Sequence, residues 1–158
     1  MEIILRELLD RLSAVHQSLE KAIVDLPDEA LDWLPGPEMN SIGVLVAHSL
    51  GSIRFWIGDV AGGSPSGRVR DAEFQSSGVT VARFVERSRE IIAHSQSVLS
   101  NLTSVELNAL RIVPKSDREV TVAWAILHAL EHAALHAGHI EITRRLWERY
   151  AGAGNLTS

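Results

Sequence analysis

Four segments of this chain repeat apolar residues at steps of three and four, the spacing of one face of an α-helix. In the first, Leu5, Leu8, Leu12 and Leu19 illustrate the pattern. The other three are expected at about residues 41–60, 80–99 and 121–149. We find no convincing strand and no internal repeat. Four amphipathic helices in 158 residues predict an all-α four-helix bundle, a fold that builds its sites between facing helices.

The connections between these segments contain residues that end or begin helices. Pro27 disfavours helix in the residue before it, so the first helix should end there. Asn40 is a suitable N-cap for the second helix, and residues 61–78 form a long loop rich in glycine and serine. We expect one domain over residues 1–150, followed by a frayed C-terminal tail at 151–158.

Charge and composition exclude several classes of protein. A formal net charge of −5 argues against nucleic-acid binding, which requires a basic surface. No apolar run approaches the roughly 20 residues needed to span a membrane, and the N-terminus lacks the apolar core of a signal peptide. We therefore expect a cytoplasmic protein with no membrane partner. Because the chain has no cysteine, any reactive sulfur must arrive on a substrate.

The fourth helix carries four of the seven histidines, at His128, His132, His136 and His139. At 100° per residue they lie within an arc of about 80°. All four cannot bind one ion, because His128 and His136 are separated by a rise of about 12 Å, whereas a zinc–nitrogen bond is about 2.1 Å. One neighbouring pair could bind a metal with a ligand from another helix, as helical histidines four apart do in metalloproteases.

The spacing alone does not identify that third ligand. His16, His48 and His94 each lie on a different one of the other three helices. A single histidine on an apolar face is usually a hydrogen-bonded core residue. Four in one stripe are harder to explain in that way, because each buried imidazole needs partners for its nitrogens.

Three stretches together resemble the DinB family of the DinB/YfiT-like metalloenzymes. They are "ALDWLPGPEMNSIGVLVAHSLGSIRFWIGDVAGG", "RVRDAEF" and "HALEHAALHAGHIEITRRLW", and they span nearly the whole chain. The resemblance implies an up-down-down-up four-helix bundle, a homodimer, and a divalent metal held by three histidines. Carried over by position, the ligands are His48, His132 and His136. For imidazole ligands we expect zinc or nickel as the metal, with iron and manganese as alternatives.

This chain departs from the family at one position beside the implied ligands. His139 stands where the family usually has glutamine, so it is expected either to take over the supporting role of that glutamine or to perturb the metal. His128, one turn before the pair, has no ligand role by resemblance and is a second possible supporting residue.

The resemblance implies an enzyme that activates a small-molecule substrate, either a low-molecular-weight bacterial thiol or water, at the metal. Arg54 and Arg144 are weak candidates for contacting a substrate carboxylate, and no catalytic residue is identified. Hydrolysis lacks an evident general base, because Glu131 points about 100° away from His132 on the helix. The alternative is a non-catalytic dimeric protein that binds metal or responds to stress.

Overall fold

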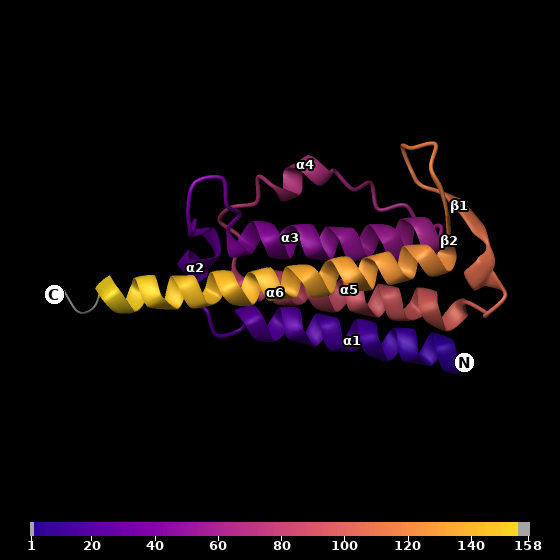
Figure 1. Ribbon diagram of the computed structural model, residues 1–158, viewed down its shortest axis with the longest axis horizontal. Helices are drawn as coiled ribbons and strands as arrows, with labels where there is room; N and C mark the ends of the chain where they lie inside the picture. Colours follow the sequence, from indigo (N-terminus) through magenta and orange to yellow (C-terminus); the bar gives the residue numbers. More distant parts are fainter. Residues whose placement is uncertain (1, 155–158) are drawn as a thin grey trace.

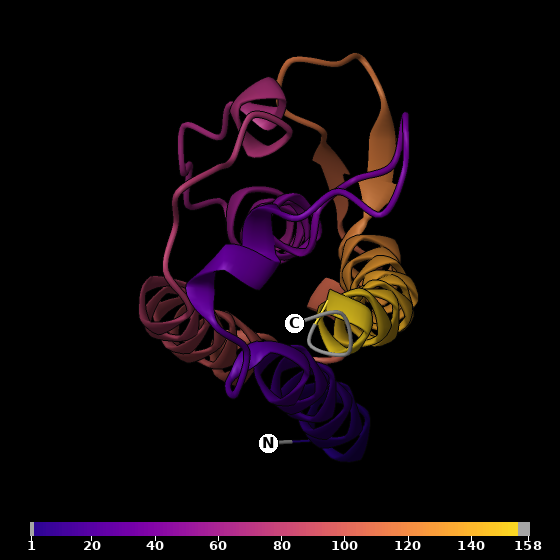
Figure 2. The ribbon, with the colours of Figure 1, turned by 90° about the vertical axis from the view of Figure 1, so that its left-hand side faces the viewer.

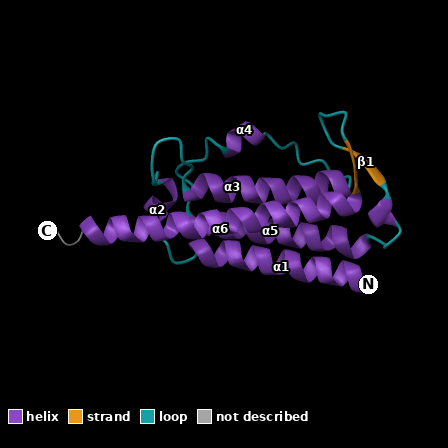
Figure 3. Ribbon diagram, viewed as in Figure 1, coloured by secondary structure: helices purple, strands orange, loops and turns teal. Residues whose placement is uncertain are grey.

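The computed structural model describes residues 2–154 and consists of four long helices that lie side by side (Figure 1). Short elements occupy the connections, and the only sheet in the described part of the chain is a small hairpin (Figure 3). In chain order the elements are α1 (Ile3–Ile23), α2 (Asp28–Asp32), α3 (Ile42–Ile53), the π-helix η1 (Arg54–Ala61), α4 (Arg70–Glu73), α5 (Val81–Asn101), the 3₁₀ turn η2 (Glu106–Asn108), β1 (Leu110–Ile112), β2 (Glu119–Thr121) and α6 (Val122–Gly154).

The long helices follow the up-down-down-up order. In Figure 1, α1 and α6 run in one direction, whereas α3 and α5 run in the other. Viewed along the bundle, α6 packs against α1 and α3, and α5 packs against the same two helices from the other side (Figure 2). The all-α fold predicted from the sequence is therefore confirmed.

Small residues let α6 lie close to its neighbours. Ala125, Ala129, Ala133 and Ala137 recur every four residues and are buried in the core. Because an alanine stripe lets two helix backbones approach, the side chains on its flank can reach the facing helix. The histidines at 128, 132 and 136 each precede one of these alanines and therefore lie on that flank.

The second helix begins and continues differently from the sequence-based expectation. Ser41, and not Asn40, caps α3, because the Ser41 hydroxyl accepts a hydrogen bond from the Val44 amide at 3.2 Å. After Ile53 the helix widens into the π-helix η1 instead of continuing as an α-helix to residue 60. Residues five apart stack in a π-helix, and an ion pair of 2.8 Å joins Arg54 to Asp59.

The connectors contain three short elements that periodicity did not predict. The helices α2 and α4 interrupt the connector at 27–40 and the loop at 61–78. The β1–β2 hairpin is antiparallel, with Leu110 opposite Thr121, and corrects the expectation that the chain has no strand. Each strand has only three residues, too few to show an alternating pattern. Lys115, between the strands, adopts a left-handed backbone with φ of 63°.

The last helix is longer than the apolar pattern indicated. It continues past Arg149 to Gly154, so the first part of the expected tail at 151–158 is helical. Residues 155–158 of that tail lie outside the described residues. Among residues 2–154, no helix combines the length and the apolar character that crossing a membrane requires.

Candidate metal centre

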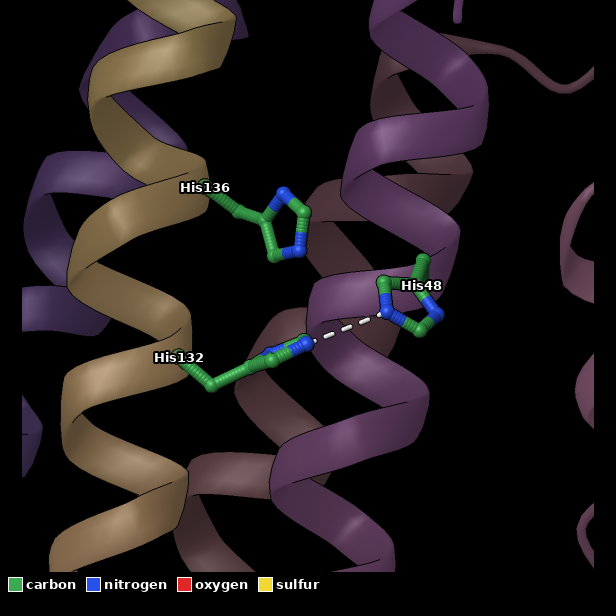
Figure 4. A group of neighbouring side chains, drawn as sticks. All are labelled: His48, His132 and His136. Atoms are coloured by element: carbon green, nitrogen blue, oxygen red, sulfur yellow. Dashed lines mark hydrogen bonds between the residues drawn. The ribbon is translucent and has the colours of Figure 1, made fainter.

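The structure brings His48, His132 and His136 together between α3 and α6. Each offers one ring nitrogen, and these three nitrogens all lie within 4.8 Å of one another. Figure 4 shows the two α6 rings projecting toward α3, with His48 facing them. Spacing of four residues places His132 and His136 one turn apart on the same face, so the long-range contact with His48 completes the group.

A buried carboxylate fixes the orientation of His48. The Nδ1–H of His48 donates to Glu73 Oε2 at 2.9 Å, and the two residues are 6% and 7% exposed. Because an ionised carboxylate can only accept a hydrogen bond, the proton of the imidazole resides on Nδ1. The lone pair is then on Nε2, which lies 3.2 Å from His132 Nε2 (Figure 4). A carboxylate behind a histidine in this way is typical of protein metal sites.

Arg68 holds Glu73 in place, and Gly51 leaves room for its carboxylate. Arg68 donates to both Glu73 oxygens, from Nε at 2.6 Å and from an NH2 nitrogen at 2.8 Å. Burial alone would raise the pKa of Glu73, but the hydrogen bonds from Arg68 and His48 hold the pKa below its usual value. Gly51 on α3 leaves the space for this carboxylate, because a Cβ there would collide with Glu73 Oε1.

Sequence reasoning missed Glu73 and Arg68 as parts of the site. Both belong to "RVRDAEF", one of the stretches that carried the family resemblance, so the signal was present. From the sequence alone, neither residue has a predicted role in the site. Arg68 is paired with Glu73, and the loop brings this partner against a histidine 25 residues earlier in the chain.

The two α6 histidines are in an environment that keeps them neutral. Burial, followed by the neighbouring histidines His136 and His48, lowers the pKa of His132 to about 4. Burial and the proximity of His48 and His139 likewise lower the pKa of His136 to about 4. A metal binds only neutral imidazole, so these shifts favour metal binding near neutral pH.

The arrangement also fits a metal geometrically. Two nitrogens bound to one tetrahedral ion at about 2.1 Å lie roughly 3.4 Å apart. The separation of 3.2 Å between the Nε2 atoms of His48 and His132 is close to that value. The residues present therefore fit a divalent cation.

The two predicted supporting histidines lie on either side of this group. His128 stacks on Trp124 at 4.7 Å between ring centroids and meets the edge of Trp56. His139 is exposed, with its ring centroid 5.4 Å from that of His136. Within residues 2–154, neither forms a side-chain hydrogen bond to a member of the group.

The remaining histidines are outside the group. His16 is buried in the core between α1 and α5, where its Nδ1 lies 3.2 Å from the Ser88 hydroxyl. His94 lies beside Gly58 and Arg54. Neither residue belongs to the group formed by His48, His132 and His136.

The two arginines proposed for a substrate carboxylate do not line the cavity at the histidines. Arg54 is bound to Asp59 and to the Ser64 carbonyl oxygen, at 2.8 and 3.0 Å. Arg144 binds Asp25 through two nitrogens, at 2.6 and 3.0 Å, on the far part of α6. Nearby carboxylates bind both guanidinium groups, and a role for either arginine in substrate binding stays a prediction.

The histidines open onto a cavity of about 510 Å³, a size suited to a small-molecule ligand. His48, His128 and His132 line it together with the aromatic rings of Phe55 and Trp56. Residues 68–71, in the glycine- and serine-rich loop, border it. Lys115 reaches it from the β1–β2 hairpin.

The structure is a four-helix bundle with three histidines converging between its second and last helices, and DinB-like proteins are among the solved structures with the same fold. Solved structures share the fold. A DinB-like protein from Bacillus cereus has a TM-score of 0.72 and 16% identity, with 87% of this chain and 89% of that chain covered. A DinB-like protein from Bacillus subtilis has a TM-score of 0.68 and 16% identity, covering 88% and 90%. A conserved protein from Enterococcus faecalis has a TM-score of 0.71 and 17% identity, covering 92% and 97%.

The sequence identifies the family of this chain. Residues 5–149 match the model of the mycothiol-S-transferase family. The match covers most of the chain, so the protein belongs to this family, and the DinB resemblance is confirmed. No curated protein matches the chain significantly.

Proposed function

We propose that the protein is a divalent-metal-dependent transferase that activates a low-molecular-weight thiol. The observation that carries the proposal is the convergence of His48, His132 and His136, of which His48 and His132 line a cavity of about 510 Å³. Among residues 2–154 no fourth ligand joins them. Structural zinc sites are closed by four protein ligands, whereas three ligands leave a position for a substrate.

Each part of the centre has a defined task in this proposal. His48, His132 and His136 would hold the metal, and Glu73, fixed by Arg68, keeps the Nε2 lone pair of His48 directed at it. The bound metal would act as a Lewis acid that lowers the pKa of a coordinated thiol. The cavity then orients the rest of the thiol beside the second substrate and limits access of water.

Two features favour a thiol over water as the activated group. Hydrolysis needs a base, but Glu73 already accepts hydrogen bonds from Arg68 and His48 and has a lowered pKa. The chain also has no cysteine, so a sulfur nucleophile must come from a substrate. The name of the family suggests mycothiol as that substrate.

Three imidazoles suit zinc or nickel, with iron and manganese as alternatives, because selection among these ions depends on geometry and supply as well as on ligand type. Elemental analysis of protein purified without a histidine tag would identify the ion. Replacement of His48 by glutamine should remove most of the bound metal, whereas the same change at His94, outside the group, should not.

Turnover is the direct test. Metal-loaded protein is incubated with mycothiol and an electrophile, and the loss of free thiol is followed. We expect turnover that chelation abolishes and that added metal restores. Thiol binding without turnover, with a range of electrophiles, would contradict the transferase and favour a non-catalytic metal-binding protein.

A further inference from the structure

A second cavity, of about 280 Å³, adjoins the Arg68–Glu73 pair. Arg68 lines both this cavity and the one at the histidines, whereas no described histidine lines the second. Its lining comes from α3, η1, α5 and the loop that carries α4, and Figure 2 shows that loop over α3 before the chain continues into α5. The cavity is therefore a separate space, and the proposed thiol chemistry makes no use of it.

The lining of this second cavity carries a surplus of positive charge. Arg54, Arg68 and Arg87 border it, and Glu73 is the carboxylate among its described lining residues. Glu73 neutralises Arg68, and Asp59 neutralises Arg54 through an ion pair of 2.8 Å. The charge of Arg87 is left without a counter-charge, in a chain whose formal net charge is −5. A cavity with such a surplus attracts anions.

Arg87 is half-buried on α5 and has no partner in the described part of the chain. Its guanidinium forms neither an ion pair nor a side-chain hydrogen bond with residues 2–154. Two other arginines of α5 differ in this respect, because Arg83 pairs with Glu86 and Arg89 pairs with Glu20. Taking a charged group partly out of water is unfavourable unless it is paired, so a bound anion would stabilise Arg87 in this position.

The two paired arginines also retain hydrogen-bond donors. A guanidinium has five N–H groups. Arg54 uses Nη1 for its contacts, and Arg68 uses Nε and Nη2. Within residues 2–154, the Nε and Nη2 groups of Arg54 and the Nη1 group of Arg68 form no hydrogen bond. Ser76 adds a hydroxyl to the lining. A tetrahedral oxyanion has enough acceptor oxygens to use several of these donors at once.

We propose that this second cavity binds a phosphate group, with Arg87 as its principal ligand and Arg54 and Arg68 beside it. Arginine recognises phosphate through charge-assisted hydrogen bonds from its planar fork of donors. A phosphate dianion carries more charge and more acceptor oxygens than a carboxylate, so it suits guanidinium groups that come from three elements. The volume of about 280 Å³ also leaves room for the organic part of a small phosphate ester. The proposal concerns a different cavity from the metal centre and does not depend on the proposed function.

Isothermal titration calorimetry of the metal-loaded full chain tests this proposal. The two probes are inorganic phosphate and glycerol phosphate, each titrated at constant ionic strength set with sodium chloride. We expect saturable binding of at least one probe. Binding of both would identify free phosphate as sufficient, and binding of the ester alone would identify an organic phosphate as the ligand. Arg87→Gln should weaken the binding about tenfold or more, because hydrogen bonds between charged groups are lost.

Arg89 provides the matched control on the same helix. It is exposed and does not line the cavity, so Arg89→Gln removes the same charge two residues away and should bind phosphate within about twofold of the wild type. Equal weakening in both variants would reduce the effect to overall charge and overturn the site. Phosphate held by the metal instead would keep its affinity in Arg87→Gln and lose it in His48→Gln, which would also overturn the site. Absence of saturable binding by either probe would do the same.

Discussion

Replacing Glu73 by glutamine isolates the role of the carboxylate behind His48. The change preserves the shape of the side chain but replaces an ionised acceptor with a neutral amide. Glu73 Oε2 accepts the His48 Nδ1–H bond at 2.9 Å, and both residues are buried. An amide can present its NH2 group to His48 instead, which would place the imidazole proton on Nε2, where the metal should bind.

The expected loss follows from what outer partners contribute to metal sites. Removal of such a partner typically weakens metal binding by about 10- to 100-fold, or roughly 1.4 to 2.7 kcal/mol. We expect the upper part of this range, because Glu73 also loses its ion pair with Arg68 and both partners are largely buried. Competition with a chromophoric chelator at pH 7.5 would measure the dissociation constant.

Glu131 provides the matched control for this measurement. It is an exposed carboxylate directly before His132, so Glu131→Gln removes the same charge from the vicinity without removing a hydrogen bond to a ligand. Its metal affinity should stay within about twofold of the wild type, since exposed charges are screened. If Glu73→Gln also binds metal within twofold of the wild type, Glu73 does not orient His48.

Three further predictions concern other parts of the molecule. Burial lowers the pKa of His16 from 6.5 to about 4, so the unfolded chain binds more protons between these values. The contribution of His16 to the free energy of unfolding should be complete above pH 6.5 and should fall by about 3 kcal/mol as the pH drops to 4. Denaturant titrations of His16→Gln should lack this part of the pH dependence. Gly51→Ala should weaken metal binding at least as much as the change at Glu73, because the new Cβ displaces that carboxylate, whereas Gly138→Ala, which meets open space, should not. Exposed apolar side chains along α6, including Leu135, predict a homodimer; light scattering should give twice 17.3 kDa, and the mass of one chain would refute it.

The sequence by itself determined the helices and most of the fold. Leu5, Leu12 and Leu19 are buried on one face of α1, as their spacing requires. The apolar repeat of a helix depends only on residues close in the sequence, so it can be recognised without any knowledge of tertiary contacts. It failed where structure is short or irregular, as in the three-residue strands and at Arg54, where the α-helix becomes a π-helix.

Only part of the candidate site could be predicted from the helix repeat. The helix repeat placed His132 and His136 on one face, but it left His16, His48 and His94 open as the third residue. The choice of His48 came from the resemblance to a family.

Only the tertiary structure showed what surrounds these histidines. It brings Glu73 from a four-residue helix to His48 and places Arg68 behind it, contacts that no spacing along the chain encodes. It also showed that Arg54 and Arg144 are already bound to carboxylates. Helix faces follow from a repeat along the chain, whereas the pairing of buried charges depends on which loops the packed core brings together.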